Sequence, residues 1–159
     1  MTVEVLPGHL KTHWPEIRAA LLNGSYRPQP VLRKEIPKPG GGVRELGIPT
    51  VLDRLIQQAL AQVLQAEWDR SFSRFSFGFR PRRSAHQAIA CAQQFLREGY
   101  AWVVDLDVER FFDRVVHEVL MVRVKRRIAD PRVLKVIDRY LKSGVMIGVM
   151  LEPTEEGVP

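Results

Sequence analysis

The sequence predicts an α+β protein that is rich in helices and has short antiparallel strands. Several stretches repeat apolar residues at a helical spacing of three and four, and each is bounded by a capping residue or a glycine. Between them lie short extended runs, two of which flank a Pro-Gly-Gly-Gly turn. At 159 residues, 45% of them hydrophobic, the chain is long enough to bury a core of its own.

The composition favours a polyanionic partner. Lys and Arg number 24 against 18 acidic residues, which gives a net charge of +6. The single cysteine, Cys91, cannot form an internal disulfide, and this indicates a reducing, cytoplasmic setting. Because no apolar run approaches the length of a membrane span, we expect no membrane partner.

The N-terminal part of the chain predicts a helix followed by a hairpin. Residues 1–25 have a helical pattern that ends at Asn23-Gly24. Residues 26–49 form two extended segments around the glycine-rich tip, which predicts a β-hairpin with a mobile loop. Lys38 and Arg44 stand on opposite sides of the tip and can converge on one anion. The alternative is a flexible surface hairpin whose charges are simply solvated.

Further elements follow in order. Helices are predicted over 50–68, 84–99, 116–128 and 130–144, and a strand over 145–151. Thr50 and Asp53 form a capping box at the start of the first of these helices, and Ser84 and Gln87 form one at the start of the second.

The loop over 72–84 interleaves four aromatic residues with four arginines. Arginine binds phosphates and aromatic rings stack on bases, so this mixture suits a nucleic-acid contact loop. Arg80, Arg82 and Arg83 are the candidate contacts. Several of the phenylalanines are expected to pack inward as anchors.

Residues 102–113 are the candidate metal-binding stretch. A β-branched run predicts a buried strand, and three aspartates and two adjacent phenylalanines follow within a few positions. Strand alternation places Asp105 and Asp107 on one face. Carboxylates fixed by a strand are good ligands for Mg²⁺, which keeps open positions for substrate phosphates. The alternative is a helix cap or turn, which suits Asp113 better than Asp107.

Three ordered blocks resemble the first half of a group II intron-encoded reverse transcriptase, also called the intron maturase. The blocks are 36–49, 77–86 and 107–113, and the resemblance runs from about Tyr26 to Pro159. It implies reverse-transcriptase-like fingers over 1–100 and the start of a partial palm over 101–159, truncated before the remaining catalytic blocks.

The resemblance also implies residue roles. Asp107 would be the catalytic ligand of two Mg²⁺ ions, with Mn²⁺ as a substitute, and the carbonyl of Val108 would complete one site. Lys38 and Arg44 would grip the triphosphate of the incoming nucleotide. Phe112 would lie under the deoxyribose as a steric gate against a 2′-hydroxyl.

The implied partners follow from the same family. Arg80, Arg82 and Arg83 would meet the template. The partners would be an intron RNA template, a DNA primer and deoxynucleotides, and the activity would be RNA-directed DNA synthesis that also serves intron splicing and mobility. A homodimer through the fingers region is left open.

The family also has features that this sequence lacks. A Gln-Gly block follows a Gly-x-Pro like that at 157–159, and a Tyr-Ala-Asp-Asp strand comes later; neither is present. We therefore expect the chain alone not to polymerise DNA, because one carboxylate cannot hold two cations. The alternatives are a non-catalytic RNA-binding module and a retron or defence-type bacterial reverse transcriptase.

Overall fold

The computed structural model describes residues 1–158, and Pro159 lies outside the described residues. The chain forms two compact units, one made of Met1–Ile56 with Glu109–Pro159 and the other of Gln57–Val108. These units group residues that pack together. The division into fingers over 1–100 and palm over 101–159 concerns the parts of a polymerase and stays a prediction.

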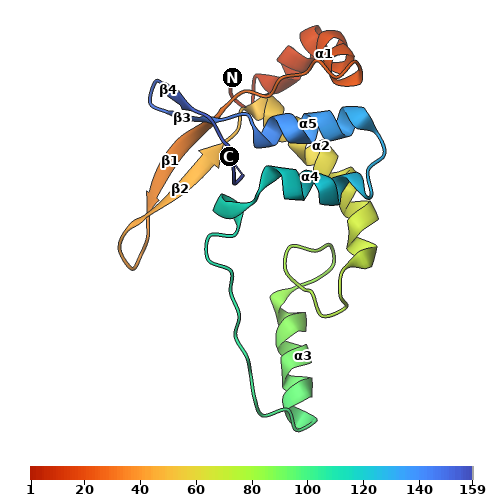
Figure 1. Ribbon diagram of the computed structural model, residues 1–159, viewed down its shortest axis with the longest axis vertical. Helices are drawn as coiled ribbons and strands as arrows, with labels where there is room; N and C mark the ends of the chain where they lie inside the picture. Colours follow the sequence, from red (N-terminus) through yellow and green to blue (C-terminus); the bar gives the residue numbers. More distant parts are fainter. Residues whose placement is uncertain (159) are drawn as a thin grey trace. The chain divides into compact units, whose positions relative to one another are not determined.

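The first unit combines helices with a four-stranded sheet (Figure 1). Its elements are α1 (Leu6–Leu22), β1 (Val31–Pro37), β2 (Val43–Ile48), the start of α2 (Val51–Trp68), the 3₁₀ turn η2 (Phe112–Arg114), α4 (His117–Lys125), α5 (Pro131–Leu141), β3 (Val145–Ile147) and β4 (Met150–Glu152). The strand order is β2-β1-β3-β4. Strands β1 and β2 are antiparallel, as are β3 and β4, and β1 is parallel to β3. The predicted α+β class and the predicted hairpin are confirmed.

The last two strands correct one expectation. A single strand was predicted over 145–151, but the chain turns at Gly148 and Val149 and returns as β4. Gly148 has a φ of 61°, a left-handed conformation that glycine adopts without steric cost. The parallel pairing of Val31 with Val145 joins the two hairpins into one sheet.

The second unit contains the rest of α2, the 3₁₀ turn η1 (Asp69–Ser71), the loop to residue 84, α3 (Ala85–Arg97) and an extended segment that reaches Val108. The capping box at the start of α3 is confirmed. The Ser84 hydroxyl accepts from the Gln87 N–H at 3.4 Å, and the Gln87 side-chain oxygen accepts from the Ser84 N–H at 3.0 Å.

The strand predicted for 102–108 is wrong for the part of the chain that the structure describes. This segment is extended but pairs with no strand there. Trp102, Val104 and Leu106 are 94%, 80% and 88% exposed. β-Branched and aromatic residues favour an extended backbone, but a strand also requires a partner to complete its hydrogen-bonding ladder.

A buried carboxylate holds the first unit together. Asp53 is 1% exposed. Its Oδ1 accepts from the hydroxyls of Tyr26 at 2.7 Å and Tyr140 at 3.1 Å. Its Oδ2 accepts from the Thr50 hydroxyl at 2.6 Å and the Gln29 N–H at 3.3 Å. The Asp53 N–H donates to the Thr50 hydroxyl at 3.1 Å, so the two residues also cap α2.

The apolar core lies in the same unit. Its buried members come from β1, α2, α4 and α5, and they are Val31, Ile56, Met121, Val136 and Leu141. Burial raises the pKa of both Tyr26 and Tyr140 above the ordinary tyrosine value. The next cause is the hydrogen bond to Asp53 for Tyr26 and the charge of Asp53 for Tyr140. Both phenols therefore stay protonated and keep donating to Asp53.

We expect Asp53→Ala to lower the free energy of unfolding by ~3 kcal/mol or more, because several part-buried hydroxyl donors lose their acceptor at once. Urea denaturation followed by circular dichroism would measure the loss. Asp105→Ala is the matched control, since Asp105 is exposed, and its change should stay within ~0.5 kcal/mol. Equal losses in the two variants would contradict a central role for Asp53.

Candidate active site

The β1–β2 hairpin brings Lys38 and Arg44 to one face. Arg44 lies opposite Ile36. Lys38 follows the last residue of β1 and continues the pairing through its hydrogen bond to Gly42, so alternation from Ile36 places both cations on the same side. The tip is closed by the Lys38 N–H, which donates to the Gly42 carbonyl at 3.0 Å, and by the Gly41 N–H, which donates to the Lys38 carbonyl at 3.1 Å. Both side chains belong to exposed residues.

This cationic face carries no carboxylate. Alternation adds Lys34 to it, together with half-exposed apolar side chains, which are Leu32, Ile36, Leu46 and Ile48. The strand glutamates, Glu35 and Glu45, fall on the opposite face. There Arg33 lies 3.7 Å from Glu45 and 4.0 Å from Glu152. The face with Lys38 and Arg44 is therefore both apolar and positively charged.

Arg80 organises the loop between α2 and α3. All five of its N–H groups donate within the loop. Two go to the Asp69 carboxylate at 2.7 and 3.2 Å and one to the Asp69 carbonyl at 2.9 Å. The others go to the carbonyls of Ser73 at 2.8 Å and Ser76 at 3.0 Å. Hydrogen bonding from Arg80 lowers the pKa of Asp69, so this carboxylate stays ionised.

These contacts turn the Arg80 side chain inward, where it is 8% exposed. It also lies 5.4 Å from the centre of the Phe72 ring. The geometry gives Arg80 a structural role in its own loop, and the predicted contact with a template stays a prediction.

The other predicted loop residues face outward. Arg82 and Arg83 are exposed, and the guanidinium of Arg83 lies 5.6 Å from the centre of the Phe77 ring. Phe79 is fully exposed rather than packed inward as an anchor, and Phe72 and Phe75 are each 47% exposed. A loop that exposes both an aromatic ring and guanidinium groups can stack a base and bind a phosphate.

Asp107 and Val108 are both exposed at the end of the second unit. Carboxylate and carbonyl oxygens suit a hard cation such as Mg²⁺. Among residues 1–158, however, no cluster of three or more His, Cys, Asp or Glu side chains could hold a metal ion. The donor chemistry therefore fits, while the number of donors falls short of a complete site.

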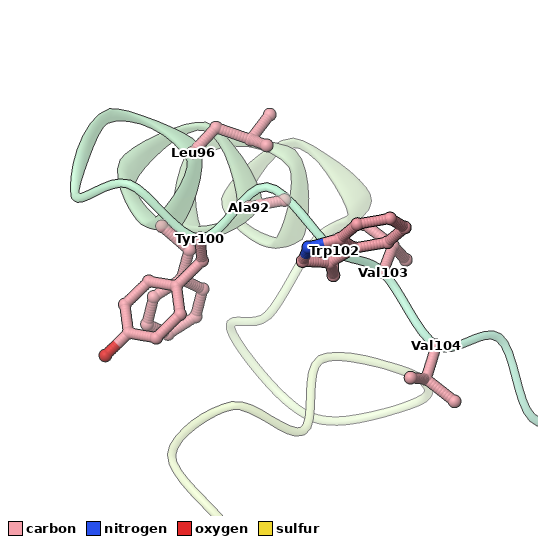
Figure 2. A pocket seen from close by; sticks show the side chains of 7 residues that line it. Ala92, Leu96, Tyr100, Trp102, Val103 and Val104 are labelled. Carbon is pink, nitrogen blue, oxygen red and sulfur yellow. The ribbon is translucent and has the colours of Figure 1, made fainter.

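An apolar cavity of about 610 Å³ lies beside the segment that leads to Asp107 (Figure 2). Its lining comes from α3 and from the extended chain after it, and consists of Ala92, Phe95, Leu96, Tyr100, Trp102, Val103 and Val104. The Phe95 ring lies 5.8 Å from the Tyr100 ring and 5.5 Å from the Phe75 ring, so these three side chains form one aromatic cluster.

Phe112 lies in η2, with its ring 69% exposed and 5.4 Å from that of Phe111, which is 57% exposed. Its carbonyl accepts from the Val158 N–H at 2.9 Å. Sequence reasoning missed this contact and the one between His117 and Gly157 described below. The partners are some 40 positions apart, and no periodic pattern links them.

The sequence and the fold of this chain are similar to those of known proteins. Residues 36–159 match the family model described as reverse transcriptase (RNA-dependent DNA polymerase). The chain belongs to this family. Protein YkfC of Escherichia coli (strain K12) is 36% identical over 159 residues, which cover 98% of this chain and 42% of YkfC. The group II intron-encoded protein LtrA of Lactococcus lactis subsp. cremoris is 34% identical over 145 residues, which cover 91% of this chain and 24% of LtrA.

This reverse transcriptase chain thus spans less than half the length of both relatives. The predicted resemblance to group II intron-encoded reverse transcriptases is confirmed by them. A solved structure of a partial Cas6-RT-Cas1–Cas2 complex has a TM-score of 0.56 and 24% identity, and the match covers 94% of this chain and 26% of that one. It supports the predicted reverse-transcriptase-like fold.

Among the described helices, none is long and apolar enough to cross a membrane.

We expect Arg80→Lys to loosen the loop although it keeps the charge, because a lysine cannot supply five N–H donors. Chymotrypsin cleavage within 72–84 should become roughly tenfold faster. Arg82→Lys changes an exposed side chain of the same loop and should leave the cleavage rate unchanged. If Arg80→Lys resists cleavage as well as the unaltered chain, Arg80 does not hold this loop.

Proposed function

We propose that this chain forms the fingers and the start of the palm of a group II intron-type RNA-directed DNA polymerase. One observation supports this proposal most directly. In a chain of the reverse transcriptase family, Lys38 and Arg44 lie on a hairpin face that has no carboxylate. The intron RNA template, the DNA primer and the role in splicing and mobility are supported by the likeness to an intron-encoded protein.

The hairpin would bind the incoming deoxynucleotide. Arg44 offers a planar fork that matches phosphate oxygens, and Lys38 adds a mobile point charge on the same face. Together they would reduce the repulsion between the triphosphate and the primer end. Ile36 and Leu46 give the nucleotide an apolar surface beside these charges.

Asp107 would act as a metal ligand with the Val108 carbonyl. Bound Mg²⁺, or Mn²⁺, would activate the primer 3′-hydroxyl and stabilise the leaving pyrophosphate. Two cations at one site repel each other and need several anionic ligands. We therefore expect the 159-residue chain by itself not to extend a primer. Further carboxylates would come from a palm strand that pairs with the exposed segment at 102–106.

The remaining side chains would select the substrate. Phe112 would lie under the sugar and exclude a 2′-hydroxyl, while Phe79, Arg82 and Arg83 would contact the template strand. The cytoplasmic setting and a homodimer through the fingers region are further parts of this proposal.

We expect Asp107→Asn to slow primer extension by roughly a thousandfold or more, because a lost metal ligand removes several kcal/mol of transition-state stabilisation. The measurement is single-turnover extension on an RNA template, in a polypeptide that contains this chain. Asp105→Asn alters a neighbouring exposed carboxylate and should keep most of the rate. If Asp107→Asn extends normally, the catalytic assignment is wrong. If no form extends a primer but RNA still binds, the non-catalytic RNA-binding module is the better description.

Replacement of both Arg82 and Arg83 by alanine should weaken RNA binding and reduce its salt dependence. Two lost phosphate contacts on a single strand lower the slope of log K against log salt by roughly 1.4. Titrations of RNA at several salt concentrations measure this slope. A control variant with alanine at Arg123 and Arg126 loses the same charge near the end of α4 and should keep the slope. Equal slope changes in the two variants would mean that the loop has no special role.

A further inference from the structure

The segment around Phe112 is held by a loop that lies some 40 residues further along the chain. The Val158 N–H donates to the Phe112 carbonyl at 2.9 Å, and the Gly157 N–H donates to the Val115 carbonyl at 2.9 Å. An isolated antiparallel bridge between residues 116 and 156 continues this pairing. Backbone hydrogen bonds therefore join this loop to η2 and to the residues that lead into α4.

A buried histidine also binds this loop, through a side-chain hydrogen bond. His117, the first residue of α4, is 5% exposed, and its Nε2 lies 2.6 Å from the Gly157 carbonyl oxygen. A carbonyl oxygen can only accept, so Nε2 must carry the hydrogen. Gly157 is thus held through both its N–H and its carbonyl, by Val115 and by His117.

The position of Gly157 leaves no room for a side chain. Its φ is 81°, and an added Cβ would lie 2.8 Å from the carbonyl oxygen of Asp113 and 3.1 Å from its carbonyl carbon. Such a contact cannot be relieved by rotating a side chain, because the atoms belong to the backbone next to Phe112. The loop and η2 are therefore in direct backbone contact.

Phe112 depends on this backbone for its position. Phe112 is 69% exposed, and its ring centre lies 5.4 Å from that of Phe111, which is itself 57% exposed. Little packing surrounds the ring, so the place of the ring is set mainly by where its own backbone lies. A gate that separates a 2′-hydrogen from a 2′-hydroxyl must be positioned to within about 1 Å, since misplacements of that size change rates strongly.

We propose that His117 and Gly157 form a clamp that positions Phe112, which makes His117 a positioning residue for sugar selection. This inference rests on the proposed function, in which Phe112 is the gate. His117 touches neither nucleotide nor metal in this scheme. It acts through the Gly157 carbonyl, the Val158 N–H and the Phe112 carbonyl, in that order.

The test compares two amide replacements of His117 in a polypeptide that contains this chain. The glutamine amide nitrogen can reach the place of Nε2 and donate to Gly157, whereas the shorter asparagine reaches only the place of Nδ1. We expect His117→Asn to lower the preference for deoxynucleotides over ribonucleotides by roughly three- to tenfold, the size of one lost buried hydrogen bond. His117→Gln should keep the preference. His13→Asn, on the exposed part of α1, is the matched control.

A double-mutant cycle separates positioning from a general loss of structure. If His117 acts through Phe112, His117→Asn should add no further loss of selectivity in a Phe112→Ala background. Gly157→Ala should reduce selectivity in the same direction as His117→Asn, and it keeps the inference testable if His117→Asn fails to fold. Additive effects in the cycle would overturn the clamp, and so would unchanged selectivity in both single variants.

Failure of this inference differs from failure of the proposed function. A parent polypeptide that does not extend a primer, or extends with ribonucleotides equally well, would refute the polymerase or gate assignment itself. A parent that selects deoxynucleotides, with His117→Asn and Gly157→Ala equally selective, would leave the function standing and remove the clamp.

Discussion

The carboxylate of Asp53 is buried among donors that come from three separate parts of the first unit. Tyr26 and Gln29 precede β1, Thr50 follows β2, and Tyr140 lies on α5. A buried charge is tolerated only when hydrogen bonds replace its lost hydration, so these groups must assemble together or not at all. Because Gln29 and Thr50 flank the two strands, one carboxylate holds both ends of the hairpin base.

The two tyrosines must stay protonated to keep donating hydrogen bonds to Asp53. Both have a raised pKa, so their contribution to stability is fully present below the ordinary tyrosine pKa of about 10 and is lost only as pH rises through the higher folded values. Arg139 extends the network, because its guanidinium donates to the carbonyls of Gly24 and Tyr26. The two tyrosine hydroxyls therefore keep donating to Asp53 across the neutral range.

Local signals in the sequence were enough for some features and insufficient for others. The hairpin follows from alternation and a glycine tip, and the capping box of α3 and the Thr50 cap of α2 follow from residues three apart, all of which are short-range effects. The prediction of a strand at 102–108 was wrong because strand pairing depends on a distant partner, and β-propensity says nothing about that partner. Gly148 itself indicated a turn, but the apolar residues on both sides of it suggested one continuous strand.

The same limit applies to the candidate site. The positions of Lys38 and Arg44 on one face follow from hairpin register and could be anticipated. The inward turn of Arg80 could not, because arginine in an aromatic loop suits both a phosphate contact and an internal hub, and only the arrangement of Asp69 and the Ser73 and Ser76 carbonyls distinguishes them.

The side chains that we propose to contact a substrate must stay exposed, so packing cannot fix their positions. Lys38, Arg44 and Phe112 are all exposed, and the groups that could fix them belong to the backbone below. In both places that backbone is held by a buried polar group with several partners, which are Asp53 at the hairpin base and the pair of His117 and Gly157 beside η2. Such polar anchors specify one geometry more strictly than apolar contacts do, because a donor and an acceptor must meet at a set distance and angle. In the proposed site, the buried polar groups would therefore set the geometry, and the exposed side chains would supply the chemistry.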